Sequence, residues 1–156
     1  MLLPKRSKTE VRHHPALPFK QLPDFMPLLR SRPAVAARAL EFTILTAARS
    51  GEVRGMTWGE VDLAERLWTV PGNRMKAGAT HEVPFSDAAV AILKALMPDK
   101  PRSDAIVFAA PRGGMMSDMA LSQLLKRMDR GDITVHGFRS TFRDWAGETT
   151  QFGREE

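Results

Sequence analysis

Hydrophobic residues recur at helical spacing along most of the chain and alternate only in its middle. A short helix is predicted within residues 19–29, where two prolines limit its extent. The stretch from Pro33 to Ala48 is rich in Ala and Leu and is apolar on most sides, which predicts a buried helix. Gly51 is expected to break or turn that helix, and a second short helix is predicted over 52–58.

The middle of the chain has the pattern of a small sheet. Residues 66–70 alternate and are rich in residues that favour strands. Pro71 and Gly72 then mark a turn, and residues 74–84 are predicted to form a hairpin. Together these signals predict a three-stranded antiparallel sheet.

Helical spacing returns after the sheet. Ser86 is expected to cap a helix that runs to Met97, and Ser117 to cap another that ends near Met128. A last helix is predicted from about residue 136 to 147. The predicted fold class is therefore α+β, mainly α-helical, with one small antiparallel sheet.

The two ends of the chain differ in character. Residues 1–18 are basic and proline-rich and show no apolar periodicity, which indicates a linker or tail. Residues 19–156 are predicted to form one domain. The basic tail also holds a histidine pair, but no acidic cluster or cysteine accompanies it to form a metal site.

The composition and net charge of the chain indicate an acidic binding partner. The chain has 23 Lys and Arg against 18 Asp and Glu, a net charge of +5, and a pI near 10.1. A basic domain is the first mark of a nucleic-acid binder, although positive charge also serves solubility. No apolar run is long enough for a membrane span, and the first ten residues lack a secretory signal. The chain has no cysteine, which excludes disulfides and fits a reducing compartment.

Candidate chemistry lies on the last predicted helix. Phe138, Phe142 and Trp145 share one stripe that is expected to pack on the core. His136, Arg139 and Arg143 form the other face. Arginine offers a planar fork of donors to phosphate oxygens, and histidine can move a proton near neutral pH. An amphipathic helix with a solvated charged face has the same pattern, so this helix alone does not decide between them.

Three segments taken together are more specific. Arg49 follows the buried helix, with Glu52 three residues later, and Lys76 lies in the predicted hairpin. His136 and Arg139 then form a His-x-x-Arg motif. In this order the elements resemble the catalytic domain of the tyrosine recombinases, or phage integrases. The resemblance covers roughly residues 15–150. The amino-acid sequence is similar to that of prophage-type integrases in the stretches 40–58, 68–84 and 135–145.

The resemblance implies a role for each of these residues. Arg49 and Arg139 would clamp the scissile phosphate and stabilise the charge that grows on its oxygens. Lys76 would protonate the 5′-oxygen leaving group, and His136 would act as general acid and base. Glu52 would support the site by orienting Arg49 or the strand nearby. Additional candidates for DNA contact are Arg54, Arg74 and Arg143, whereas His81 receives no role.

The implied function is DNA integration or site-specific recombination through a 3′-phosphotyrosine intermediate. The implied partners are double-stranded DNA and other recombinase protomers, with no metal, cofactor, small-molecule substrate or membrane. The expected compartment is the bacterial cytoplasm, at the nucleoid when DNA is bound.

The chain contains no tyrosine, so it is expected to be a C-terminally incomplete catalytic domain that does not cleave DNA by itself. Two alternatives remain open. One is a non-catalytic DNA-binding or regulatory module that uses the same basic face. The other is a basic protein-interaction domain without a nucleic-acid role.

Overall fold

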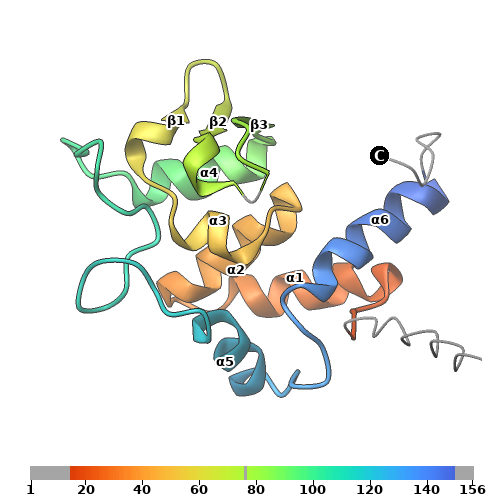
Figure 1. Ribbon diagram of the computed structural model, residues 1–156. Coiled ribbons are helices and arrows are strands. Elements are labelled where there is room, and N and C mark those ends of the chain that lie inside the picture. Colours follow the sequence, from red (N-terminus) through yellow and green to blue (C-terminus); the bar gives the residue numbers. More distant parts are fainter. Residues whose placement is uncertain (1–14, 76, 150–156) are drawn as a thin grey trace, which may run out of the picture.

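The computed structural model describes residues 15–75 and 77–149, in which one short sheet lies at one end of a group of helices (Figure 1). The helices are α1 (Leu22–Arg30), α2 (Val35–Thr46), α3 (Ser50–Arg54), α4 (Asp87–Leu96), α5 (Ala120–Arg127) and α6 (Gly137–Thr149). The strands are β1 (Val61–Asp62), β2 (Leu67–Val70) and β3 (His81–Pro84), and short 3-10 helices form at η1 (Phe19–Gln21), η2 (Trp58–Glu60) and η3 (Gly72–Arg74). The sheet is antiparallel in the order β1-β2-β3, which confirms the predicted α+β class.

The described helices include none that is both long enough and apolar enough to cross a membrane.

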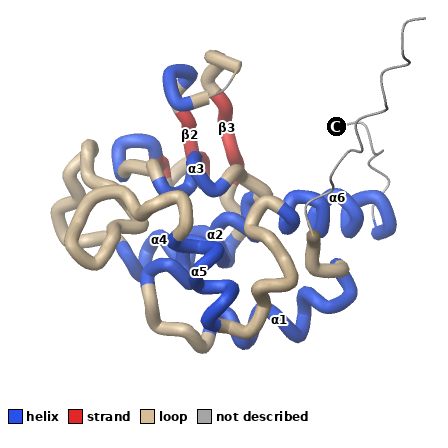
Figure 2. The backbone as a smooth tube through the Cα atoms, turned by 60° about the horizontal axis from the view of Figure 1, so that its bottom comes forward, coloured by secondary structure: helices blue, strands red, loops and turns tan. Residues whose placement is uncertain are grey.

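Helix α2 forms the centre of the core (Figures 1 and 2). Phe42 on this helix is fully buried, and its ring centroid lies 5.3 Å from that of Phe108, 5.8 Å from Trp68 and 5.9 Å from Phe85. These aromatic contacts join α2 to the sheet and to the segments that flank α4. The prediction of a buried helix within 33–48 is confirmed.

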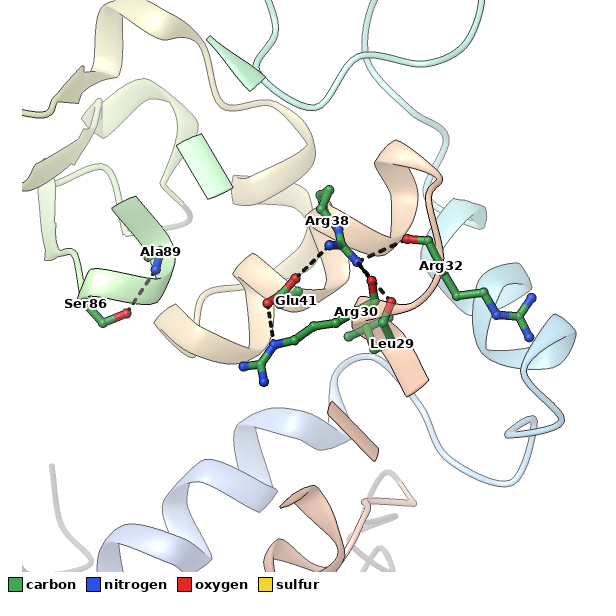
Figure 3. A network of polar contacts seen from close by, with 7 residues as sticks. All are labelled: Leu29, Arg30, Arg32, Arg38, Glu41, Ser86 and Ala89. Atoms are coloured by element: carbon green, nitrogen blue, oxygen red, sulfur yellow. Dashed lines mark hydrogen bonds and ion pairs between the residues drawn. The ribbon is translucent and has the colours of Figure 1, made fainter. Parts of the chain in front are cut away.

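A charged network holds α2 against the end of α1 (Figure 3). The buried Glu41 carboxylate accepts a hydrogen bond from Arg30 Nε at 3.0 Å and lies 3.5 Å from Arg38 Nη1. Arg38 Nη2 donates to the carbonyl oxygens of Leu29, Arg30 and Arg32 at 3.0–3.2 Å. Arg38 therefore satisfies carbonyl groups at the end of α1 while it balances the buried charge of Glu41.

The sheet contains different residues from those predicted. Strands β2 and β3 pair with Trp68 opposite Val83, and residues 71–80 connect them. Residues 72–74 form a 3-10 turn, which agrees with the turn predicted at Pro71 and Gly72, but residues 74 and 75 are not in a strand. The third strand is β1, which the pattern did not predict. Gly72 explains part of this difference, because a Cβ there would lie 2.5 Å from the carbonyl oxygen of Gly78. The connection can therefore fold back this closely only at a glycine.

The break after α2 also lies earlier than predicted. Ala47 ends α2 in the left-handed conformation with a φ of 54°, and α3 begins at Ser50. Gly51 is consequently inside a helix instead of ending one, and the helix predicted over 52–58 ends at Arg54. Arg49 is extended between the two helices and is the N-cap of α3.

One of the two predicted serine caps is present. Ser86 accepts a hydrogen bond from the backbone N–H of Ala89 at 3.2 Å and caps α4 (Figure 3). The prediction for Ser117 was wrong, because α5 begins three residues later with Met119 at its N-cap and no side-chain cap.

The start of α6 is fixed by the described end of the predicted linker, residues 15–18. Leu17 is buried there, and its carbonyl oxygen accepts a hydrogen bond from Thr141 Oγ1 at 2.6 Å. A Cβ on Gly137 would lie 2.3 Å from the carbonyl oxygen of Pro15, so only glycine fits at the first position of α6. The domain boundary at residue 18 stays a prediction, and these four residues pack against the domain.

The aromatic stripe of α6 is only partly buried. Phe138 is buried, with its ring 5.5 Å from that of Phe25. Phe142 is 45% exposed and Trp145 is 44% exposed, and their two rings pair at 5.7 Å. The expectation that all three pack on the core was wrong for the last two, because α6 extends away from the other helices (Figure 1). Helical spacing predicts a shared face but not the element that covers it.

Candidate nucleic-acid interface

Arg49 lies at the junction between α2 and α3. Its carbonyl oxygen accepts the N–H groups of Glu52 and Val53 at 3.1 and 3.2 Å, which holds its backbone to the first turn of α3. Its side chain is 49% exposed, and Nη1 lies 3.6 Å from Glu52 Oε1. The Glu52 side chain is only 10% exposed. The carboxylate thus orients one side of the guanidinium and leaves the rest open to solvent.

His136 and Arg139 lie at the opposite end of the chain, at the start of α6. His136 is exposed and directly precedes the helix, and its carbonyl oxygen accepts the N–H of Arg139 at 3.1 Å. Arg139 is half-buried in the first turn. Thr134 Oγ1 accepts the N–H of Gly137 at 3.0 Å, so a hydroxyl satisfies one of the free donors at this helix end.

The loop before α6 has a defined geometry. Asp129, two residues past the end of α5, is left-handed with a φ of 57°, and the N–H of Arg130 donates to the carbonyl oxygen of Leu125 at 2.8 Å. Arg130 also donates twice to the carboxylate of Asp132, at 3.0 and 3.1 Å. This side-chain hydrogen bonding lowers the pKa of Asp132 below its ordinary value. These backbone and side-chain hydrogen bonds fix the conformation of the loop that leads from α5 to His136.

A surface hollow of about 400 Å³ brings the two segments together. Its polar lining comes from α3, α5, the segment before α5 and the approach to α6, and it includes Ser50, Arg54, Asp118, Ser122, Lys126, Thr134 and His136. Because Ser50 follows Arg49 directly, the two segments that carry Arg49 and His136 border the same hollow. The lining holds one carboxylate, that of Asp118, but two basic side chains, three hydroxyls and an imidazole accompany it, so the hollow can take a phosphate.

Two of the additional arginine candidates differ in their surroundings. Arg54 Nε donates to Ser50 Oγ at 3.0 Å, and its Nη1 donates to the carbonyl oxygen of Met116 at 3.1 Å. These bonds hold the side chain between α3 and the segment before α5. Arg143 is exposed, and its Nη2 lies 3.4 Å from Ser140 Oγ on the same helix. Arg143 therefore remains available at the surface of α6.

Arg74 has partners inside the protein. It forms an ion pair with Glu60, and its Nη2 donates to the carbonyl oxygen of Glu52 at 2.6 Å. Glu60 could not be identified from the sequence, because no local pattern links it to an arginine 14 residues later. Lys76 lies outside the described residues. His81 is exposed on β3, opposite Val70.

Comparisons with known proteins agree with this fold and motif order. The family model described as the phage integrase family matches residues 15–146. The chain is 30% identical to the integrase of Enterobacteria phage P4 over 92% of this chain and 37% of that protein. It is 32% identical to the prophage integrase IntA of Escherichia coli K12 over 85% of this chain and 33% of that protein.

A solved structure of the Tn1549 transposon integrase in complex with a circular intermediate DNA shares the fold, with a TM-score of 0.73 and 15% identity. That comparison covers 93% of this chain and 57% of the other. The lambda integrase tetramer bound to a Holliday junction gives a TM-score of 0.63 at 17% identity, over 87% of this chain and 44% of the other.

The fold is thus that of a tyrosine recombinase catalytic domain. The chain belongs to the phage integrase family. It spans about a third of the length of the curated relatives it matches.

Proposed function

We propose that this chain is the phosphate-holding part of a site-specific DNA recombinase and that it binds duplex DNA. The observation that carries the proposal is the shared hollow between α3 and the start of α6. It is bordered by the segments of Arg49 and His136, the same residues that the family resemblance assigns to the reacting phosphate. The net charge of +5 supports the same conclusion, because basic groups neutralise phosphates and release counterions.

Each residue receives one role in this proposal. Arg49 and Arg139 bind the non-bridging oxygens of the scissile phosphate and stabilise their growing charge. Glu52 orients Arg49 through their ion pair. His136 exchanges a proton at the reacting oxygens, and Lys76 donates one to the 5′-oxygen as it leaves. Arg143 contacts a neighbouring phosphate from the surface of α6.

The covalent step needs a group that these 156 residues do not contain. A tyrosine hydroxyl would attack phosphorus and lose its proton, the bond to the 5′-oxygen would break, and that oxygen would take up a proton. The chain has no tyrosine, so it binds DNA in this proposal but does not cleave it alone. Other protomers of the recombinase are its partners on DNA, and the bacterial cytoplasm is its compartment.

Binding to DNA is expected to depend strongly on salt. Fluorescence anisotropy with a short labelled duplex should give a log–log plot of affinity against salt concentration with a clearly negative slope. The slope is about −0.9 for each phosphate that the protein neutralises. The titration should be run from about 50 to 200 mM salt, the range over which phosphate contacts weaken most visibly. Failure to bind at every salt concentration would contradict the proposal and favour a protein-interaction domain.

A non-catalytic DNA-binding module that uses the same basic groups is the second candidate, and the net charge of +5 supports it equally. It predicts the same salt-dependent binding, so the two are separated by a different experiment. A tyrosine-bearing segment of a related integrase, added to the chain and DNA, should produce covalent protein–DNA adducts if the chain supplies a catalytic phosphate site. A module that only binds DNA would give none.

A further inference from the structure

Arg74 links three parts of the domain that are distant in sequence. It lies at the end of η3, and its side chain is only 24% exposed. Its Nη1 donates to the Glu60 carboxylate, and its Nη2 donates to the carbonyl oxygen of Glu52 at 2.6 Å. The guanidinium also lies directly over α3, because a Cβ added to Gly55 would be 3.0 Å from Nη2. One planar group therefore connects η3, η2 and α3.

Glu60 is a firm anchor for this arginine. Its side chain is only 8% exposed, and it accepts hydrogen bonds from Trp68 Nε1 at 3.1 Å and from Thr57 Oγ1 at 3.3 Å. Trp68 is fully buried on β2, so the carboxylate is tied to the core of the sheet. A buried carboxylate with this many partners has little freedom to move, and Arg74 supplies the opposite charge that it needs.

The other end of the linkage reaches the proposed phosphate clamp. Glu52, whose carbonyl oxygen binds Arg74, is the residue whose carboxylate lies 3.6 Å from Arg49 Nη1. The contacts run from the sheet through Glu60 and Arg74 to α3, and from α3 to Arg49. Only a forked side chain can hold a carboxylate and a carbonyl oxygen in fixed directions at once, which explains why arginine suits this position.

We propose that Arg74, anchored by Glu60, is a positioning residue that fixes α3 against the sheet and thereby sets the direction of the Arg49 guanidinium. This inference rests on the proposed function for the role of Arg49, but the anchoring itself can be measured without DNA. It also assigns Arg74 a different task from the direct DNA contact that the sequence suggested.

The first test is amide hydrogen exchange of the free protein. The N–H groups of Val53 and Gly55 bond to Arg49 and Gly51 within α3 and report its opening. Arg74→Gln should raise their exchange rates about tenfold or more, as expected for a segment that opens locally. The amides that pair β2 with β3 should change much less.

Two variants sharpen this test. Arg66→Gln is the matched control, because Arg66 also pairs with a carboxylate, that of Asp87. This pair is exposed, and Arg66 directly precedes β2, whereas Arg74 follows it. It should leave α3 exchange within about twofold of the original rate, as for an exposed ion pair. Arg74→Lys keeps the charge but loses the fork, so it should also raise α3 exchange, and it remains informative if the glutamine variant does not fold. No rise in α3, or an equal rise in the sheet, would overturn the inference.

The second test measures coupling to Arg49 through binding of a short labelled duplex. The loss of affinity caused by Arg49→Ala should be smaller in the Arg74→Lys background than in the original protein, by about threefold or more. Equal losses in both backgrounds would contradict a positioning role. If Arg49→Ala has no effect in the original protein, the proposed clamp fails, whereas the exchange of Val53 and Gly55 still decides whether Arg74 anchors α3.

Discussion

Replacing Arg139 by alanine is expected to weaken binding of duplex DNA by about 1.5–3 kcal/mol, or roughly 10- to 150-fold. Arg139 is half-buried at the start of α6, so its hydrogen bonds to a phosphate would be less screened by water and salt than those of an exposed arginine. Replacing Arg49 should also have a large effect, because it would leave the poorly exposed Glu52 carboxylate unpaired beside the phosphate. Anisotropy titrations at one fixed salt concentration measure both losses.

Arg102→Ala is the matched control for these two variants. Arg102 also carries one positive charge, but it is 79% exposed and pairs with Asp104 in the loop after α4. Its removal should change DNA affinity by less than about threefold, as for an exposed ion pair that salt screens. If Arg139→Ala and Arg102→Ala lower affinity equally, the chain attracts DNA by overall charge and has no specific phosphate clamp.

Replacing Phe42 by alanine is expected to lower the free energy of unfolding by about 3–5 kcal/mol. The Phe42 ring is fully buried and lies within 6 Å, centroid to centroid, of three other aromatic rings, at 5.3, 5.8 and 5.9 Å. Its loss leaves a cavity between α2 and the sheet that the surrounding side chains fill only partly. Denaturant unfolding, monitored by circular dichroism, gives the change as a shift in the transition midpoint.

Phe142→Ala removes the same atoms at an exposed site. Because Phe142 is nearly half exposed and its ring pairs with the equally exposed ring of Trp145, the expected loss is about 1 kcal/mol or less. The difference between the two phenylalanine variants measures the contribution of the core around α2. Similar losses in both variants would show that Phe142 is packed as tightly as Phe42, which would contradict the exposure of Phe142.

Local signals in the sequence were sufficient for several elements. Helix α4 begins where Ser86 predicted it, because an N-cap hydrogen bond spans only three residues. The buried character of α2 followed from its apolar composition. Ser117 failed as a cap because the same residue type also occurs in loops, and only the backbone geometry distinguishes the two cases.

Features that depend on tertiary contacts could not be predicted in this way. Strand β1 contains two residues and exists only because it pairs with β2. The exposure of Phe142 and Trp145 depends on what lies beside α6, which helical spacing does not encode. The ion pair between Glu60 and Arg74 joins residues 14 positions apart, and no local pattern encodes that contact.

The candidate site also combines features that local sequence predicts with features that depend on tertiary contacts. Arg49 is the N-cap of α3 and Glu52 lies three residues later in its first turn, so their ion pair is a local contact that sequence spacing indicates. His136 and Arg139 likewise share one helical turn. The proximity of these two segments could not be derived from spacing, because Arg49 and His136 are 87 positions apart in the sequence. It was suggested by the family resemblance, and the roles of these residues remain proposals.

The most direct test of the phosphate site is a titration of the isotopically labelled chain with a short DNA duplex, followed by NMR through its backbone amides. The largest chemical-shift changes are expected in residues 49–52 and 136–139, the two segments that border the hollow beside α3. The loop at residues 98–105, which carries the control residue Arg102, should change little. Changes concentrated in that loop, with none at Arg49 or Arg139, would contradict the proposal that these arginines hold a DNA phosphate.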